Sequence, residues 1–133
     1  MARYFGIDEA NALLADVRPL LEQLRADRDR VAELQAELQR EMENNGSAEH
    51  AEELAQREAD LREIVRRMQS TVGQIDAWGV TLREIGTGLI DFPALANGRP
   101  IWLCWRLGEG DEIEWWHEAN SGFDSRQPLS ELT

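Results

Sequence analysis

The chain has 133 residues, with 26 acidic and 14 basic side chains, a formal net charge of −12 and a sequence pI near 4.5. A chain of this mass buries roughly two thirds of its extended surface in one compact core, so we expect a single domain over residues 1–133. The charge argues against nucleic acid or an anionic membrane surface as partner, and no apolar run reaches the ~18 residues of a membrane span.

A stripe of apolar residues spaced by seven predicts a first long helix from about Asp8 to Met42. The stripe consists of Ala10, Val17, Leu24, Val31 and Leu38. Gly6 and Glu9 resemble a capping box at its start. Because the periodicity continues across Pro19, we expect a kink at this residue and not the end of the helix.

A second stripe with the same spacing predicts a second helix after a turn signal at residues 44–47. It consists of Leu54, Leu61, Met68, Ile75 and Leu82. Two long helices joined by a short turn form an antiparallel hairpin, which we place at residues 8–82. Its apolar face is wider than one seam, so we expect a homo-oligomer, a dimer through the helices, or binding to another protein.

Residues 86–133 are expected to form a small antiparallel, Trp-rich sheet and a tail. The expected strands are residues 89–92, 101–107 and 112–118. Residues 93–100 are expected to form a loop, and the sequence leaves open whether this loop closes over a pocket. The fold class is therefore α+β, with a coiled-coil-like hairpin followed by a sheet.

The register of the last two expected strands follows from the charges and aromatic rings. We pair Leu107 with Asp111 across a three-residue turn that contains glycine. This register sets Arg106 against Glu112 and Trp102 against Trp116. It also places Cys104 and His117 on opposite faces of the sheet.

Three residues are candidates for a metal site or for acid and base catalysis: His117, Glu118 and Asp91. A histidine with carboxylates suits a divalent ion such as zinc, manganese or iron, or a pair that transfers protons, and Glu109 is a further carboxylate nearby. In the alternative interpretation, His117 only caps the apolar face at the strand end and Asp91 pairs with an arginine.

Five residues are candidates for binding a planar anion: Arg99, Arg106, Arg126, Trp102 and Trp116. Guanidinium groups beside indole rings can combine bidentate hydrogen bonds with stacking. In the alternative interpretation, Arg106 binds Glu112 and Glu114, and Arg126 orders the tail. The two tryptophans then form a contact surface for the helices or for a partner.

The single cysteine, Cys104, excludes an intramolecular disulfide, and residues 1–6 contain no apolar segment of signal-peptide length. We therefore expect a protein of the reducing cytoplasm. Cys104 is expected to be a small buried hydrophobe, since a reactive thiolate needs a basic neighbour. All basic residues are arginine, which excludes Schiff-base chemistry and the lysine of a P-loop.

Four motifs resemble the bacterial family known as domain of unknown function 2203. They are Phe-Gly-Ile-Asp-Glu-Ala-Asn at residues 5–11, Gly-Leu-Ile-Asp-Phe-Pro at 88–93, Leu-Cys-Trp-Arg-Leu-Gly-Glu at 103–109, and Trp-His-Glu at 116–118 followed by Gly122-Phe123 and Arg126-Gln127-Pro128. The resemblance covers nearly the whole chain. It implies a small cytoplasmic bacterial protein and brings no activity, cofactor or partner with it. Gly6 departs from the threonine cap that the family pattern suggests.

Two hypotheses for the function follow. The heptad spacing and the concentration of aromatic residues favour a scaffold without enzymatic activity, in which the hairpin self-associates and the Trp-rich sheet is a recognition head. The alternative is a small metal-dependent or acid/base enzyme that uses His117, Glu118 and Asp91. In that enzyme, Arg126 or Arg106 would orient an anionic substrate.

Overall fold

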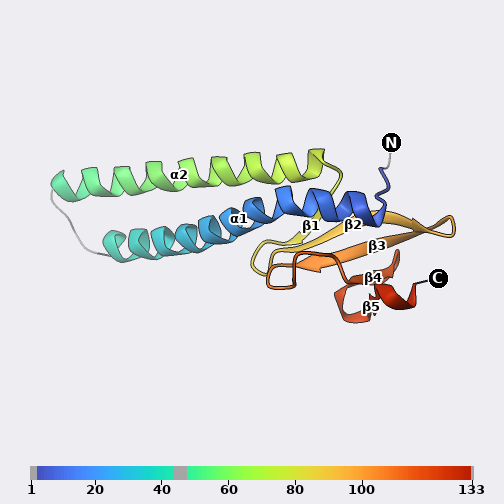
Figure 1. The fold of residues 1–133 in the computed structure, drawn as a ribbon. Coiled ribbons are helices and arrows are strands. Elements are labelled where there is room, and N and C mark those ends of the chain that lie inside the picture. Colours follow the sequence, from blue (N-terminus) through green and yellow to red (C-terminus); the bar gives the residue numbers. More distant parts are fainter. Residues whose placement is uncertain (1–2, 44–47, 133) are drawn as a thin grey trace.

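The computed structural model describes residues 3–43 and 48–132, which form two long helices followed by a five-stranded antiparallel sheet (Figure 1). The helices are α1 (Ile7–Met42) and α2 (Ala48–Ala77). The strands are β1 (Thr81–Glu84), β2 (Leu89–Ala96), β3 (Arg99–Arg106), β4 (Trp115–Glu118) and β5 (Gln127–Pro128). The α+β class and the helical hairpin are confirmed, while the turn expected at residues 44–47 lies outside the described residues.

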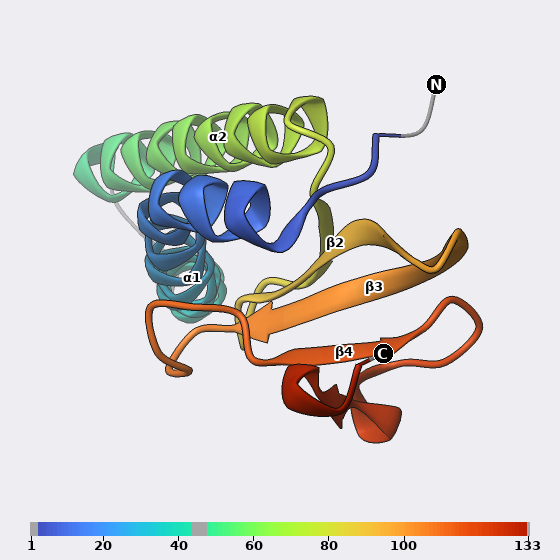
Figure 2. The ribbon, with the colours of Figure 1, turned by 45° about the vertical axis from the view of Figure 1, so that its right-hand side comes forward.

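Helix α1 begins as the sequence predicts and continues through its proline. The backbone N–H of Gly6 donates a hydrogen bond to Glu9 Oε1 (3.1 Å), and Glu9 and Asp8 complement the helix dipole in the first turn. The helix continues through Pro19 to Met42. The ribbon of α1 changes direction in its N-terminal half, as expected when a proline removes one backbone hydrogen bond (Figure 2).

Helix α2 ends at Ala77, so the prediction that the hairpin extends to Leu82 was wrong. Gly79 adopts a φ of 88°, and the Val80 N–H donates to the Ile75 carbonyl (3.3 Å). This left-handed glycine with its hydrogen bond across the helix end is a Schellman motif, which stops the helix. Leu82 keeps the spacing of the apolar stripe but lies in β1, where it pairs with Ile90.

Strands β2 and β3 meet in a two-residue turn, so the loop predicted over residues 93–100 was also wrong. Asn97 and Gly98 have φ values of 52° and 80°, as a type I′ hairpin turn requires. Pro93 is tolerated within β2 because it lies beyond the end of β1, and its carbonyl accepts the Phe5 N–H at 2.7 Å. The segment is therefore part of the sheet and forms no lid.

The register of β3 against β4 differs by one residue from the predicted one. Ile101 pairs with Glu118 and Trp102 with His117, and residues 107–114 form a longer connection in place of a three-residue turn. Because side chains alternate between the two faces of a strand, the one-residue shift brings Cys104 and His117 to the same face.

Hydrogen bonds outside the ladder hold the connection in place. Glu109 Oε1 accepts the Arg106 N–H (2.9 Å), and the Gly110 carbonyl accepts the Trp105 indole N–H (3.0 Å). The Ile113 N–H donates to Asn11 Oδ1 on α1 (2.8 Å). These contacts fold residues 107–114 against the helix, which a pairing argument confined to the two strands does not include.

The core lies between α1 and one face of the sheet (Figure 2). The sheet contributes Ile90, Phe92, Leu103, Trp105 and Trp116, and α1 contributes Ala10, Leu14, Val17, Leu21 and Leu24. At 1.5 Å per residue α1 is roughly 50 Å long, so the hairpin projects well beyond the sheet (Figure 1). In the part of the chain that the structure describes, neither helix is long and apolar enough to cross a membrane.

Candidate metal centre

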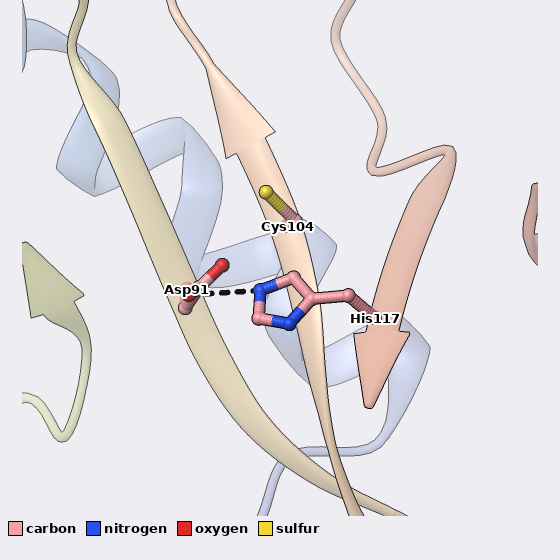
Figure 3. A group of neighbouring side chains, drawn as sticks. All are labelled: Asp91, Cys104 and His117. Carbon is pink, nitrogen blue, oxygen red and sulfur yellow. Dashed lines mark hydrogen bonds and ion pairs between the residues drawn. The ribbon is translucent and has the colours of Figure 1, made fainter. Parts of the chain in front are cut away.

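The face of the sheet opposite the core carries a cluster of three buried side chains: Asp91 from β2, Cys104 from β3 and His117 from β4 (Figure 3). Asp91 is paired with Cys104 across the ladder, and His117 lies diagonally across from Cys104 on the next strand. The three side chains are only 2%, 1% and 1% exposed. One nitrogen, one sulfur and one oxygen atom of the cluster all lie within 4.8 Å of one another.

The imidazole of His117 is fixed by hydrogen bonds at both nitrogens. Its Nδ1 lies 2.9 Å from the Glu118 carbonyl oxygen and its Nε2 lies 3.0 Å from Asp91 Oδ2. Because a carbonyl only accepts, Nδ1 must carry a proton. Nε2 is then directed into the cluster, where it either donates a proton to Asp91 or offers its lone pair to a cation.

Asp91 has one oxygen with partners and one without. Its Oδ2 faces His117 and accepts a hydrogen bond from Arg83 Nε (2.9 Å). Among residues 3–43 and 48–132, its buried Oδ1 has no hydrogen-bond partner. A buried polar atom without a partner costs about 1–3 kcal/mol, so Oδ1 is available to accept a hydrogen bond from the neighbouring Cys104 thiol or to bind a group from outside the chain.

The thiol of Cys104 is unreactive without a bound metal ion. Burial raises the pKa of Cys104 to about 12, and the Asp91 carboxylate adds to this increase, while Arg126 partly opposes it from 4.0 Å. No nitrogen of His117 is left to activate the thiol, since both nitrogens bind other groups. A cysteine–histidine nucleophile is therefore disfavoured, whereas a cation held in the cluster favours the thiolate.

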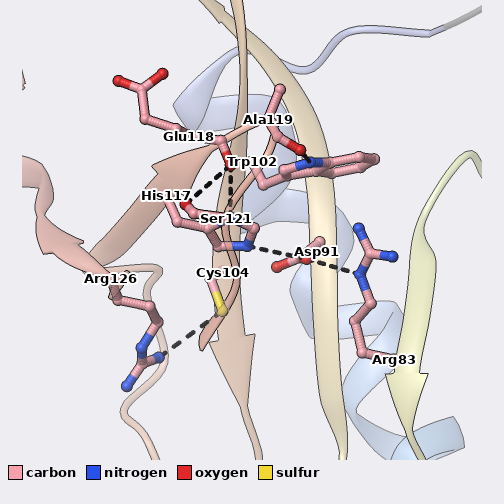
Figure 4. Close-up of polar contacts among 9 residues, drawn as sticks. All are labelled: Arg83, Asp91, Trp102, Cys104, His117, Glu118, Ala119, Ser121 and Arg126. Carbon is pink, nitrogen blue, oxygen red and sulfur yellow. Dashed lines mark hydrogen bonds and ion pairs between the residues drawn. The ribbon is translucent and has the colours of Figure 1, made fainter. Parts of the chain in front are cut away.

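Arg126 forms one wall of the site and is held rigidly. It binds the Glu109 carboxylate with both terminal nitrogens (3.0 and 2.8 Å), and its side chain is 11% exposed. Figure 4 shows its contact with Cys104. Its guanidinium carbon lies 4.1 Å from the centre of the Phe123 ring and 4.9 Å from that of Trp115. Arg126 thus orders the tail beside the cluster, which is the alternative interpretation that the sequence offered for this residue.

The remaining predicted site residues lie elsewhere. The Glu118 carboxylate binds Arg99 (3.1 and 2.9 Å) and is not part of the cluster; only its backbone carbonyl takes part. Arg106 stacks on the Phe123 ring outside the cluster and contacts Glu109, so its predicted pairing with Glu112 and Glu114 was wrong.

The two tryptophans predicted to face each other lie on opposite faces of the sheet. Trp102 covers the edge of the cluster, and its indole N–H donates to the Ala119 carbonyl (3.3 Å). Trp116 is buried in the core, opposite Leu103. The two tryptophans therefore do not form one contact surface, because the register shift turns Trp116 toward the helices.

Two residues of the site were missed by sequence reasoning. Cys104 was assigned to the wrong face because the hairpin register was wrong. Arg83 lies in β1, directly after Leu82, to which the helical stripe was wrongly extended. A β1 strand recognised after Gly79 would have placed Arg83 beside Asp91.

A pocket of about 410 Å³ lies over the cluster. Its floor contains Asp91, Cys104 and His117, and its sides are Arg83, Leu89 and residues 119–123. A ligand can therefore approach the cluster from one side, while the core closes the other side.

The family profile of an uncharacterized conserved protein (DUF2203) matches residues 3–129 of this chain. The chain belongs to this family. No curated protein and no solved structure matches it. The matched region includes all three residues of the cluster and Arg83.

Proposed function

We propose that the protein binds one divalent transition-metal ion through Asp91, Cys104 and His117, and that this ion serves a small metal-dependent enzyme. The observation that carries the proposal is the convergence of three different ligand types from three adjacent strands, all buried, with Asp91 Oδ1 lacking a partner among the described residues. This proposal keeps two of the three residues that the sequence suggested and replaces Glu118 by Cys104.

The donor set supports a transition metal. A thiolate and an imidazole nitrogen favour zinc or ferrous iron, while magnesium and calcium prefer sites made only of oxygen. Ligand atoms around tetrahedral zinc lie roughly 3.3–3.8 Å apart. Atoms that already lie within 4.8 Å of one another therefore need side-chain shifts of only about 1 Å.

The ligand count supports a catalytic role. Structural zinc sites use four protein ligands, whereas catalytic sites use three and leave a position for water or substrate. Here three residues converge at the floor of a pocket that a small molecule can enter. The hydrogen bond from His117 Nδ1 to the Glu118 carbonyl is the kind of support that orients a ligating imidazole.

The test is metal binding by the purified chain and two variants. Cobalt is the probe, because a thiolate ligand gives a charge-transfer band that other ligands do not. We expect one equivalent of cobalt with this band in the wild type, and loss of the band with a large loss of affinity in Cys104→Ala and His117→Ala. Glu118→Gln is the matched control, since its carboxylate binds Arg99, and it should bind cobalt as the wild type does.

Two results would overturn the proposal. The first is a folded wild type, checked by circular dichroism, that takes up neither cobalt nor zinc. The second is a Cys104→Ala variant that binds cobalt as tightly as the wild type and with the same spectrum.

Self-association of the hairpin is a second candidate, favoured by a separate observation. An apolar groove of about 430 Å³ runs along the hairpin and is lined by Val31, Val65, Met68, Gln69, Val72 and Ile85. Val65 is 37% exposed, whereas no tryptophan is among the exposed large hydrophobic residues of the described chain. The groove thus supports a dimer through the helices better than a Trp-rich recognition head.

Light scattering tests this second candidate directly. A dimer mass for the wild type and a monomer mass for Val65→Asp would support it, and a monomer mass for both would contradict it. The reducing cytoplasm remains our proposed location, because a single cysteine that ligates a metal must stay reduced.

A further inference from the structure

Arg83 forms one side of the pocket and carries donors that the protein does not use. Its Nε donates to Asp91 Oδ2 (2.9 Å), and its guanidinium carbon lies 4.8 Å from the centre of the Trp102 ring (Figure 4). Within the described residues, neither of its terminal NH groups has an acceptor. The side chain is 42% exposed, so these groups are accessible from the pocket.

Two other arginines near the site already bind carboxylates of the chain, and Arg106, which makes only a 4.0 Å ion pair with Glu109, does not line the pocket. Arg99 and Arg126 each bind a carboxylate of this chain, Glu118 and Glu109, with two nitrogens. A guanidinium with two parallel NH groups matches the two oxygens of a carboxylate. Arg83 is therefore placed to bind a carboxylate that comes from outside the chain.

The net charge of the site with a metal ion bound also favours a carboxylate as the ligand. A divalent ion, the Asp91 carboxylate and a Cys104 thiolate sum to zero, and Arg83 is the one arginine among the residues that line the pocket. Arg83 leaves one excess positive charge in the pocket, on a molecule whose net charge is −12. A monoanion balances this charge, whereas a dianion such as a phosphate monoester exceeds it.

The remaining sides of the pocket are apolar enough for an organic body. Leu89 and Phe123 line it, and the Trp102 ring lies beside the Arg83 guanidinium. Its volume of about 410 Å³ is in the range of small-molecule sites.

We propose that the pocket takes a small organic carboxylate, held by the terminal NH groups of Arg83, with the rest of the molecule facing the open position of the metal. This inference rests on the proposed metal centre and names the substrate class for it. Arg83 contacts the substrate directly, while its Nε–Asp91 hydrogen bond also positions a metal ligand.

The test is calorimetric titration of the cobalt-loaded protein with benzoate, after cobalt uptake has been measured separately. Benzamide, which has the same ring without the charge, is the control ligand. We expect Arg83→Gln to weaken benzoate about tenfold or more, as for the loss of a charged hydrogen bond, and to leave benzamide unchanged. Arg99→Gln is the matched protein control, because Arg99 binds the Glu118 carboxylate, does not line the pocket and should leave benzoate binding unchanged when replaced.

A second variant keeps the test decisive if Arg83→Gln disturbs the metal. Arg83→Lys retains the positive charge and a donor for Asp91 but loses the paired NH groups. We expect it to hold cobalt and to bind benzoate more weakly than the wild type.

Each outcome gives a distinct answer. If the wild type takes up no cobalt, the proposed metal centre fails and this inference fails with it. If cobalt binds but benzoate does not, or binds equally well in both Arg83 variants, only this inference fails. Inorganic phosphate that binds more tightly than benzoate would also overturn it, since the pocket would then select a different anion.

Discussion

The hairpin and the sheet each contain one buried aspartate, and the two differ in how completely they are satisfied. Asp27 on α1 is 3% exposed; Arg67 binds both of its oxygens, and Gln23 donates to one of them (2.8 Å). Asp91 in the sheet is 2% exposed, and its Oδ1 has no partner among the described residues.

The difference separates a structural carboxylate from a site. Burial alone does not distinguish the two residues, and both have an arginine partner. What distinguishes them is the free acceptor at Asp91, beside a thiol and an imidazole from two further strands. Asp27 connects the two helices, and other side chains of the chain donate hydrogen bonds to both of its oxygens. In our proposal, the metal ion supplies the partner that Asp91 Oδ1 lacks among the described residues.

The largest expected effect is stabilisation by zinc that depends on Asp91. At a free zinc concentration one hundred times the dissociation constant, binding should raise the free energy of unfolding by about 2.7 kcal/mol. Urea unfolding with and without zinc measures this increase. Asp91→Asn should lose most of it and Asp27→Asn should retain it, so equal zinc effects in both variants would contradict the comparison.

Asp27→Asn should lower the free energy of unfolding by about 1.5 kcal/mol with or without zinc. The variant loses a charged hydrogen-bond pair, although Arg67 is half exposed and water weakens the interaction. Urea unfolding of metal-free protein gives the value. No change in stability would mean that the ion pair between the two helices does not stabilise the folded chain.

The same residue should make stability depend on acid pH. The Arg67 hydrogen bond holds the pKa of Asp27 below its ordinary value, and Gln23 assists, although burial acts in the opposite direction. The unfolded chain therefore binds a proton first as the pH falls.

Asp27 thus makes its full contribution to the free energy of unfolding above the ordinary carboxyl pKa, near 3.8. This contribution is lost as the pH falls below 3.8 toward the lower pKa that Asp27 has in the folded chain. The stability difference between wild type and Asp27→Asn should be constant from neutral pH to about pH 5 and should shrink toward about pH 3. Unfolding curves across this range measure it. A difference that grows on acidification would show that the sign is wrong.

A smaller effect is expected at the turn that sets Asp91 opposite Cys104. Gly98 has a φ of 80°, and a methyl group added there would meet no atom within 4 Å, so Gly98→Ala should cost about 1 kcal/mol through backbone strain alone. Gly110→Ala is the control, because Gly110 has open space and an ordinary φ. Thermal unfolding compares the two, and equal stability would contradict the role of this turn.

The smallest effect should be that of Asp91→Asn on the metal-free protein. Its Oδ1 makes no hydrogen bond to the described residues that the substitution could remove. Of its two Oδ2 partners, Arg83 is 42% exposed, and the asparagine oxygen can still accept a hydrogen bond from His117. We expect a change of less than about 1 kcal/mol, well below that of Asp27→Asn. A larger loss by urea unfolding would assign Asp91 a structural role.

Sequence reasoning located the helices well because their evidence is local and repeated. The heptad stripe and the Gly6–Glu9 cap predicted α1 to within one residue of its observed start at Ile7. The apolar stripe predicted the wrong end for α2. Leu82 continues the seven-residue spacing, although the left-handed Gly79 already ends the helix.

The site was only half predicted because it depends on strand register. Asp91 and His117 were selected by residue type, which a sequence displays directly. Cys104 was placed on the wrong face because the Glu109 and Asn11 contacts of the β3–β4 connection are invisible to a pairing argument between two strands. Similarly, the turn signal at Asn97-Gly98 was present, but Pro93 and Pro100 suggested a loop.

All three proposed ligands come from one uninterrupted antiparallel meander, β2 to β4, of a single chain. No proposed ligand therefore comes from α2 or from a second copy of the protein. Metal content and subunit mass should vary independently: dilution or Val65→Asp can separate the copies without emptying the centre. A sample that loses its metal on dissociation would show that these two properties are linked.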